Sequence, residues 1–148
     1  MRWLAVAWLG MAGLAAAGDT RAEPWPWGAL VLARMDEGPN DPRLEKYLPD
    51  LKRVFGYRRY EIYGQAWGTG PANAESIVLP TKEFFVKLRP RGEGNRRLGF
   101  EFFRNERLLV EGEAVMPVSA PLFITGPEYG HGKLVMIVEI RDVAPKGR

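Results

Sequence analysis

The stretch RLGFEFFRNERLLVEGEAVM, residues 97–116, carries the clearest structural signal in this chain of 148 residues. On its first arm, apolar side chains recur at every second position: Leu98, Phe100 and Phe102. The polar residues Arg104-Asn105-Glu106 then interrupt the alternation. The second arm restores it with small or apolar residues at Leu108, Val110, Gly112, Ala114 and Met116, while Glu111 and Glu113 occupy alternate positions. This pattern predicts a β-hairpin with one solvated face.

Further segments with strand character lie on both sides of this hairpin. They are residues 29–33, 59–66, 76–79, 84–88, 122–124 and 134–140. Turn-forming residues separate them at intervals of about 8–12 residues, which is typical of antiparallel sandwiches and barrels. The sequence therefore predicts a mainly β protein, an antiparallel immunoglobulin-like β-sandwich of about seven or eight strands.

One helical segment interrupts the strand pattern, between residues 42 and 55. Apolar residues recur there at helical spacing: Leu44, Tyr47, Leu48, Leu51 and Phe55. Asp41 is placed to cap the segment, Pro42 suits a first helical position, and Gly56 suits its end. Pro49 cannot donate a backbone hydrogen bond to the Glu45 carbonyl. We therefore expect a short kinked helix, or two short turns, after the first strand.

Residues 1–22 have the order of a secretory signal peptide. A positive start at Arg2 precedes an apolar run from 3 to 17, and small residues allow cleavage after Ala17 or after Ala22. The run has about 15 residues, and a membrane-spanning helix needs about 20, so we favour cleavage over an uncleaved anchor. The expected location is periplasmic or secreted, with no stable membrane span after cleavage.

The remaining chain divides into three expected parts. We expect residues 23–28 to form a linker, because Pro24-Trp25-Pro26-Trp27 cannot form a regular helix. Residues 29–143 predict a single β-sandwich domain, and residues 144–148 a loose tail. The chain has no cysteine, which fits an exported bacterial protein better than a disulfide-rich secreted one.

The charge pattern favours no particular partner. The net charge is only +3, and an exported protein does not meet nucleic acid, so we expect no nucleic-acid binding. The densest basic runs are Arg58-Arg59, Lys87-Arg89-Arg91 and Arg96-Arg97. We expect them on solvated strand faces and loop tips, with contact to anionic lipid or polysaccharide as the functional alternative.

Three motifs, in this order, carry a resemblance. An acidic Asp36-Glu37-Gly38-Pro39 loop precedes the Leu-rich kinked helix, the Phe55-Gly56-Tyr57 junction follows, and Gly126-Pro127-Glu128-Tyr129-Gly130 precedes an aliphatic strand. This order resembles small exported bacterial β-rich proteins with no assigned function. The resemblance implies an exported β-rich domain and no activity.

Catalytic and metal-binding patterns are weak. His131 is the single histidine, and neither serine, Ser76 or Ser119, lies in a nucleophile elbow. Glu111 and Glu113, with Glu101, offer the carboxylate pair of a small hydrolase, although alternating glutamates are commonly the wet face of a strand. Asp36, Glu37, Asn40 and Asp41 offer calcium ligands without EF-hand spacing, and turn and cap chemistry explains them more simply. We therefore expect no enzyme activity, metal or cofactor.

The aromatic residues suggest a binding surface. Trp25 and Trp27 lie in the expected linker, and Trp67 and Tyr63 lie on or near a strand, with Tyr63 in the polar alternation. Tryptophan and tyrosine combine a large apolar area with a polar group, as sugar-binding and protein-binding surfaces do. We predict a noncatalytic binding domain of the bacterial cell envelope that contacts another envelope protein. The alternatives are a carbohydrate-binding module using these tryptophans and the hydrolase above.

Overall fold

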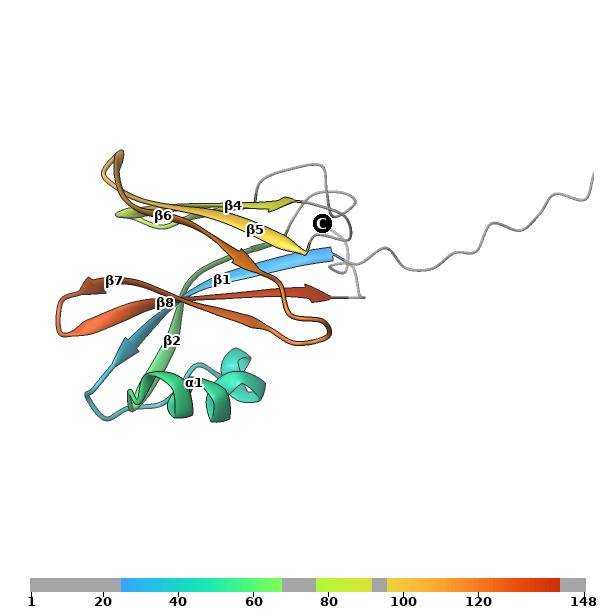
Figure 1. Cartoon of the computed structure of the whole chain (residues 1–148). Helices are drawn as coiled ribbons and strands as arrows, with labels where there is room; N and C mark the ends of the chain where they lie inside the picture. The colour runs from blue at the N-terminus through green and yellow to red at the C-terminus, as the bar shows by residue number, and fades with distance from the viewer. Residues whose placement is uncertain (1–24, 68–76, 92–95, 142–148) are drawn as a thin grey trace, which may run out of the picture.

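Eight antiparallel strands form two four-stranded sheets that pack face to face (Figure 1). The computed structural model describes residues 25–67, 77–91 and 96–141. The elements, in order, are β1 (Trp25–Arg34), η1 (Pro42–Tyr47), α1 (Leu48–Phe55), β2 (Arg59–Trp67), β3 (Ile77–Pro80), β4 (Phe84–Arg91), β5 (Arg97–Arg104), β6 (Arg107–Val115), β7 (Leu122–Tyr129) and β8 (Gly132–Arg141). The predicted antiparallel sandwich with one short helical segment after its first strand is confirmed.

The strand order separates the two sheets along the chain. Sheet A has the order β2-β1-β8-β7, so the first and last strands lie at its centre. Sheet B is the meander β3-β4-β5-β6, in which β6 is an edge strand. The protein therefore shares the two-sheet architecture of an immunoglobulin domain but not its topology. In an immunoglobulin domain, consecutive strands are distributed between the two sheets in a different order.

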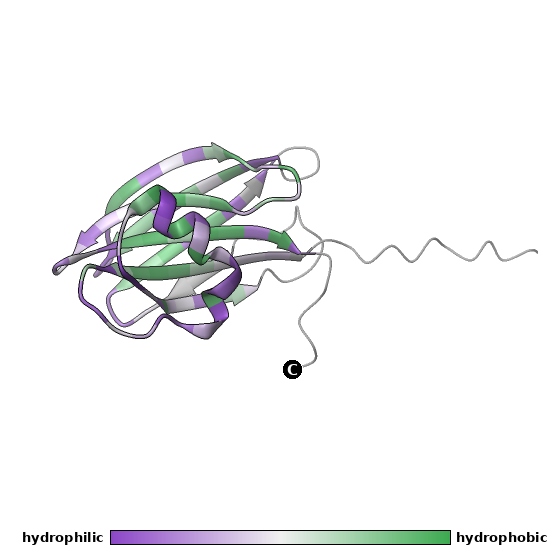
Figure 2. Ribbon diagram, turned by 90° about the horizontal axis from the view of Figure 1, so that it is seen from below, coloured by the Kyte–Doolittle hydropathy of each residue, from purple (hydrophilic) through white to green (hydrophobic). Residues whose placement is uncertain are grey.

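Sheet A is buried on both faces, because sheet B covers one face and the helical segment covers the other (Figures 1 and 2). The sandwich core lies between the sheets, and its buried members are Leu30, Leu32, Phe84, Val86, Leu88, Leu98, Phe102, Met116, Ile124, Leu134, Met136 and Val138. The outer core lies beneath the helices and consists of Trp27, Ala29, Val31, Ala33, Leu44, Tyr47, Leu51, Tyr60, Val135 and Ile137. Burial on both faces explains why β1 and β8 are almost continuously apolar.

The helical segment has the interruption that Pro49 predicts. A 3₁₀ helix, η1, runs to Tyr47, and α1 begins at Leu48. Pro49 lies in the first turn of α1, where backbone N–H groups have no partner within the helix, so its missing N–H costs no hydrogen bond. The Asp41 carboxylate accepts a hydrogen bond from the Arg43 N–H at 3.0 Å and caps η1. Gly56 ends α1 in the left-handed conformation, with φ of 72°. The predicted cap, break and end are all confirmed.

The first strand begins earlier than expected. β1 includes Trp25 to Gly28, where we expected a linker. Within the described residues Pro26 pairs with β8 alone, opposite Ile140, because pairing with β2 begins at Trp27; β1 is an edge strand at this point, where proline is tolerated. The expected signal peptide (1–22), the first linker residues and the tail (144–148) lie outside the described residues. No helix within the described ranges has the length and apolar character needed to cross a membrane.

Two strands contain bulges that the sequence pattern did not reveal. In β2, Leu30 pairs with Gly64 but Val31 with Ile62, so Tyr63 is an extra residue and turns inward to the sandwich core. Tyr63 lies on the opposite face of β2 from Tyr60 and Ile62, as the alternation predicts, but this face packs on the sandwich core and leaves Tyr63 only partly exposed. In β6, Phe103 pairs with Leu108 but Phe102 with Val110, which places Leu108 on the opposite face from Val110. The rest of the predicted β5–β6 hairpin is confirmed.

Candidate functional site

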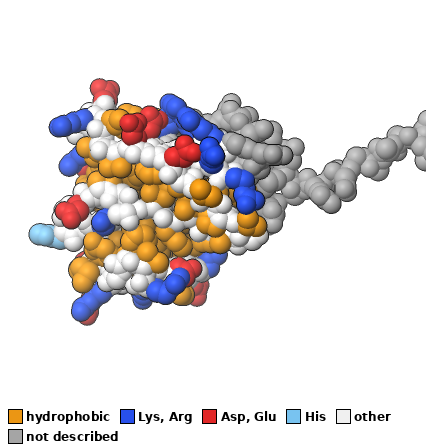
Figure 3. Space-filling model, viewed as in Figure 1, with side chains coloured by type: hydrophobic (Ala, Val, Ile, Leu, Met, Phe, Trp, Pro, Cys, Tyr) orange, Lys and Arg blue, Asp and Glu red, His pale blue; other side chains and the backbone are white. Residues whose placement is uncertain are grey.

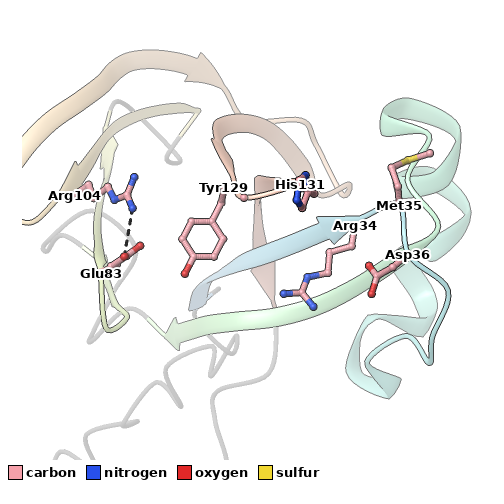
Figure 4. A pocket seen from close by; sticks show the side chains of 9 residues that line it. Arg34, Met35, Asp36, Glu83, Arg104, Tyr129 and His131 are labelled. Atoms are coloured by element: carbon pink, nitrogen blue, oxygen red, sulfur yellow. Dashed lines mark hydrogen bonds and ion pairs between the residues drawn. The ribbon is translucent and has the colours of Figure 1, made fainter.

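A cavity of about 690 Å³ opens at one end of the sandwich, where β1 ends, β4 begins and the β7–β8 turn lies (Figure 4). Its lining combines charged, aromatic and small residues: Arg34, Met35, Asp36, Glu83, Arg104, Tyr129, Gly130, His131 and Gly132. Ligand sites commonly have volumes of about 300–1,000 Å³ and a few convergent polar groups. The end cavity, as we call this site, has both properties.

A tight turn shapes one wall of the end cavity. Tyr129 ends β7, and the two-residue turn Gly130-His131 leads into β8. Gly130 has φ of +60°, which the first central position of this kind of hairpin turn requires. A Cβ at Gly132 would collide with the Ala33 carbonyl, so only glycine lets the turn approach the end of β1 so closely. The turn leaves His131 exposed at the rim of the cavity.

Tyr129 lies between the charged walls of the end cavity (Figure 4). Its ring contacts Phe84 edge-on at 5.4 Å and the Tyr63 ring at 5.8 Å between centroids. The Tyr63 and Tyr129 hydroxyl oxygens are 3.5 Å apart. This hydrogen bond, together with burial, raises the pKa of Tyr63 above its ordinary value. Tyr63, a predicted binding residue, therefore packs beside Tyr129 but is not among the residues that line the cavity.

Ion pairs hold the charged walls in place. On one side, Arg104 Nη2 lies 3.3 Å from Glu83 Oε1, and the Arg104 guanidinium lies 5.6 Å from the Phe84 ring centroid. On the other side, Asp36 lies 2.9 Å from Arg59, and Arg34 lies 3.4 Å from Glu61. The second Glu83 oxygen, Oε2, is buried and accepts no hydrogen bond within the described part of the chain. A buried acceptor without a donor is unfavourable, so this oxygen lowers the stability of the fold at the cavity wall.

Two of the predicted tryptophans meet in a different place, at the opposite end of β1. Arg141 lies 3.8 Å from the Trp27 ring centroid and 5.1 Å from that of Trp67. The Trp27 ring is also stacked on Tyr47 at 5.8 Å, with 10° between the planes. Trp27 is only 2% exposed, so its indole has no face available to a sugar ring. Trp67 is partly exposed, and for Trp25 only the strand backbone is described.

Hydrogen bonds complete this group, which we call the Arg141 cluster: Trp27, Tyr47, Trp67, Glu139 and Arg141. Arg141 donates to the Tyr47 hydroxyl at 2.6 Å and to Glu139 at 3.0 Å, and Tyr47 donates to Glu139 at 2.5 Å. Burial acts to raise the pKa of Glu139, but the bonds from Tyr47, Arg141 and Lys46 outweigh it and lower that pKa. Burial and the bond to Glu139 raise the pKa of Tyr47. The cluster joins η1 to three strands, which is a structural role.

A third feature is the apolar surface of the edge strand β6. Every residue of β6 except Ala114 is exposed. Leu108, Leu109 and Val110 are between 38% and 42% exposed, and Phe85 on the outer face of β4 is 42% exposed. Figure 3 shows hydrophobic side chains gathered in a band across the face on which β6 and β7 lie, with charged groups around it. Exposed apolar side chains on a monomeric domain are usually scattered singly. A contiguous apolar patch on an edge strand therefore indicates an interaction surface.

The other residues that the sequence suggested for metal binding or catalysis are either engaged in ion pairs and hydrogen bonds or lie away from the end cavity. Asp36 pairs with Arg59 and Glu37 with Arg58, while Asn40 accepts from the Tyr60 N–H and Asp41 caps η1. Glu111 and Glu113 lie on the outer face of β6, over a depression of about 470 Å³. Ser76 lies outside the described residues. Within the described ranges, no three His, Cys, Asp or Glu side chains are grouped to hold a metal ion.

Sequence reasoning missed most of the end cavity. Arg34, Glu83 and Arg104 come from three strand ends that are far apart in the chain, and no local pattern connects them. The signal that did exist was the Gly126–Gly130 motif followed by His131, which lies in the β7–β8 hairpin. Comparison with models of known protein families, with curated proteins and with solved structures finds no match to this chain.

Proposed function

We propose that this protein is a noncatalytic, exported interaction domain of the bacterial cell envelope that binds a partner protein along β6. The observation that carries the proposal is the exposure of Leu108, Leu109 and Val110 on an edge strand. An unpaired edge offers a row of backbone donors and acceptors to an added strand. The signal-like residues 1–22 support export to the compartment where such a partner would be met.

The charges along β6 define the chemistry of the partner. The apolar half of β6 is followed by Glu111 and Glu113, and Glu111 lies directly opposite Glu101 of β5. Glu113 is 3.9 Å from Arg97, whereas Glu111 makes no ion pair within the described residues. A partner strand that complements β6 therefore carries apolar residues against Leu108–Val110 and a basic residue near Glu111.

Site-specific crosslinking in the native envelope tests this proposal. A photoreactive amino acid at position 109 should capture one partner, whereas the same group at the exposed Val54 of α1, on the other side of the molecule, should not. The captured peptide should be extended, apolar and basic. Capture of a second copy of this chain, or equal capture from both positions, would contradict the proposal.

Charge reversal provides a matched control. Glu111→Lys should reduce capture roughly tenfold, since an unfavourable contact replaces a favourable one at the partner's basic residue. Glu45→Lys makes the same change in net charge at an exposed position of η1, and it should leave capture unchanged. If both variants lose capture equally, overall charge explains binding and β6 does not.

A further inference from the structure

The end cavity differs from the proposed β6 surface in both place and chemistry. Its charges are balanced by the protein itself: Glu83 pairs with Arg104, Asp36 with Arg59, and Arg34 with Glu61. A charged ligand would have to break one of these pairs and leave a group without its counter-ion. An uncharged ligand with many hydroxyl groups has no such cost, because a hydroxyl group both donates and accepts.

The hydrogen-bonding inventory of the walls matches a hydroxyl-rich ligand. Glu83 Oε1 accepts from Arg104 and can accept a further hydrogen bond with its second lone pair, whereas Oε2 is buried out of reach of a ligand. Arg34 and Arg104 use only part of their five N–H groups in their ion pairs, so each retains donors. Figure 4 shows Tyr129 between these walls, where its ring offers apolar surface beside the polar groups.

We propose that the end cavity binds an uncharged sugar, with Glu83 Oε1 accepting from a ring hydroxyl, Arg34 and Arg104 donating to others, and Tyr129 contacting the apolar face of the ring. The volume of about 690 Å³ suits a ligand of one or two sugar units. This site is distinct from the tryptophans that the sequence suggested, since none of them lines the cavity and Trp27 is only 2% exposed. It also stands independently of the partner surface on β6.

Saturation-transfer NMR on the full chain as exported tests the site. The probes are glucose, galactose, N-acetylglucosamine, maltose and cellobiose, with lysine, glutamate and inorganic phosphate as charged competitors. We expect transfer to at least one sugar and to none of the charged probes. A charged probe that binds in place of sugars would overturn the charge-balance argument, and so would the absence of sugar binding in a protein shown to be folded by circular dichroism.

Variants locate the binding on the residues of the cavity. Glu83→Gln keeps the side-chain size and removes the charged acceptor, so sugar binding should weaken roughly tenfold. Glu37→Gln makes the same chemical change at an exposed residue outside the cavity and should have no effect. Loss of the Glu111 or Leu109 surface should leave sugar binding intact. Equal affinity in Glu83→Gln and the unchanged protein would place any observed sugar elsewhere and overturn the assignment.

Discussion

Arg141 connects side chains from three elements, β1, η1 and β8. Its guanidinium lies over Trp27 and donates to Tyr47 and Glu139. Hydrogen bonds to charged groups contribute about 1.5–3 kcal/mol, and a cation–π contact about 0.5–1 kcal/mol. Arg141→Ala should therefore lower the free energy of unfolding in urea by about 2–3 kcal/mol. Arg53→Ala, which breaks an exposed pair within α1, should lower it by less than about 0.5 kcal/mol.

The pH dependence of stability follows from Glu139. Burial acts to raise its pKa, but the bonds from Tyr47, Arg141 and Lys46 lower that pKa below the ordinary value of 4.5. The folded state therefore binds fewer protons than the unfolded state, and the stabilisation is present above pH 4.5 and is lost as pH falls below it. Urea unfolding of Glu139→Gln should show a deficit against the unchanged protein at pH 7 that shrinks towards pH 3. A deficit that is constant with pH would refute this account.

At the scale of elements, the β5–β6 turn contains stored strain. Asn105 and Glu106 are its two central residues, with φ of 47° and 69°. Asparagine tolerates the left-handed region, but glutamate is unfavourable there by about 1–2 kcal/mol. Glu106→Gly should raise the free energy of unfolding by about 0.5–1 kcal/mol, after allowance for the greater freedom of glycine in the unfolded chain. Glu106→Ala keeps the strain, so in thermal unfolding it should give no comparable gain.

The strands show what local patterns can and cannot predict. Alternation identified β5 and β6, and cap chemistry at Asp41 and Gly56 identified the bounds of the helical segment. The bulges at Tyr63 and Leu109 were not predictable, because an inserted residue reverses the face of its neighbours without changing composition. The extension of β1 to Trp25 depends on a partner strand, β8, more than 100 residues away in the sequence.

At the scale of the whole molecule, topology creates the sites. The end cavity exists because the β1 end, the β4 start and the β7–β8 turn meet, and no segment of the sequence contains that information. The tryptophans were detectable from their residue type alone. Their burial was not, since Tyr47 reaches Trp27 through the packing of η1 on sheet A, and Arg141 reaches it through the pairing of β8 with β1. Exposed apolar positions on β6 likewise depend on its place at the sheet edge.

The closeness of the two sheets provides a further test at this scale. A Cβ at Gly126 of β7 would lie 2.9 Å from the Leu134 carbonyl oxygen and 3.1 Å from the ring of Phe102, which is fully buried on β5. The backbone carbonyl cannot move aside cheaply, and Phe102 is surrounded by the sandwich core. Gly126→Ala should therefore lower the free energy of unfolding by about 1–3 kcal/mol, measured by urea unfolding.

Gly99 of β5 provides the control for this substitution. A Cβ there would meet its nearest neighbours at 3.8 Å, an ordinary contact distance. Alanine also loses less conformational freedom on folding than glycine does, so Gly99→Ala should be neutral or stabilising by up to about 1 kcal/mol. If the two substitutions destabilise the protein equally, the close approach of β7 to Phe102 does not set the distance between the sheets. If only Gly126→Ala is destabilising, the close approach of β7 to the Leu134 carbonyl and the Phe102 ring leaves no room for a side chain at this position.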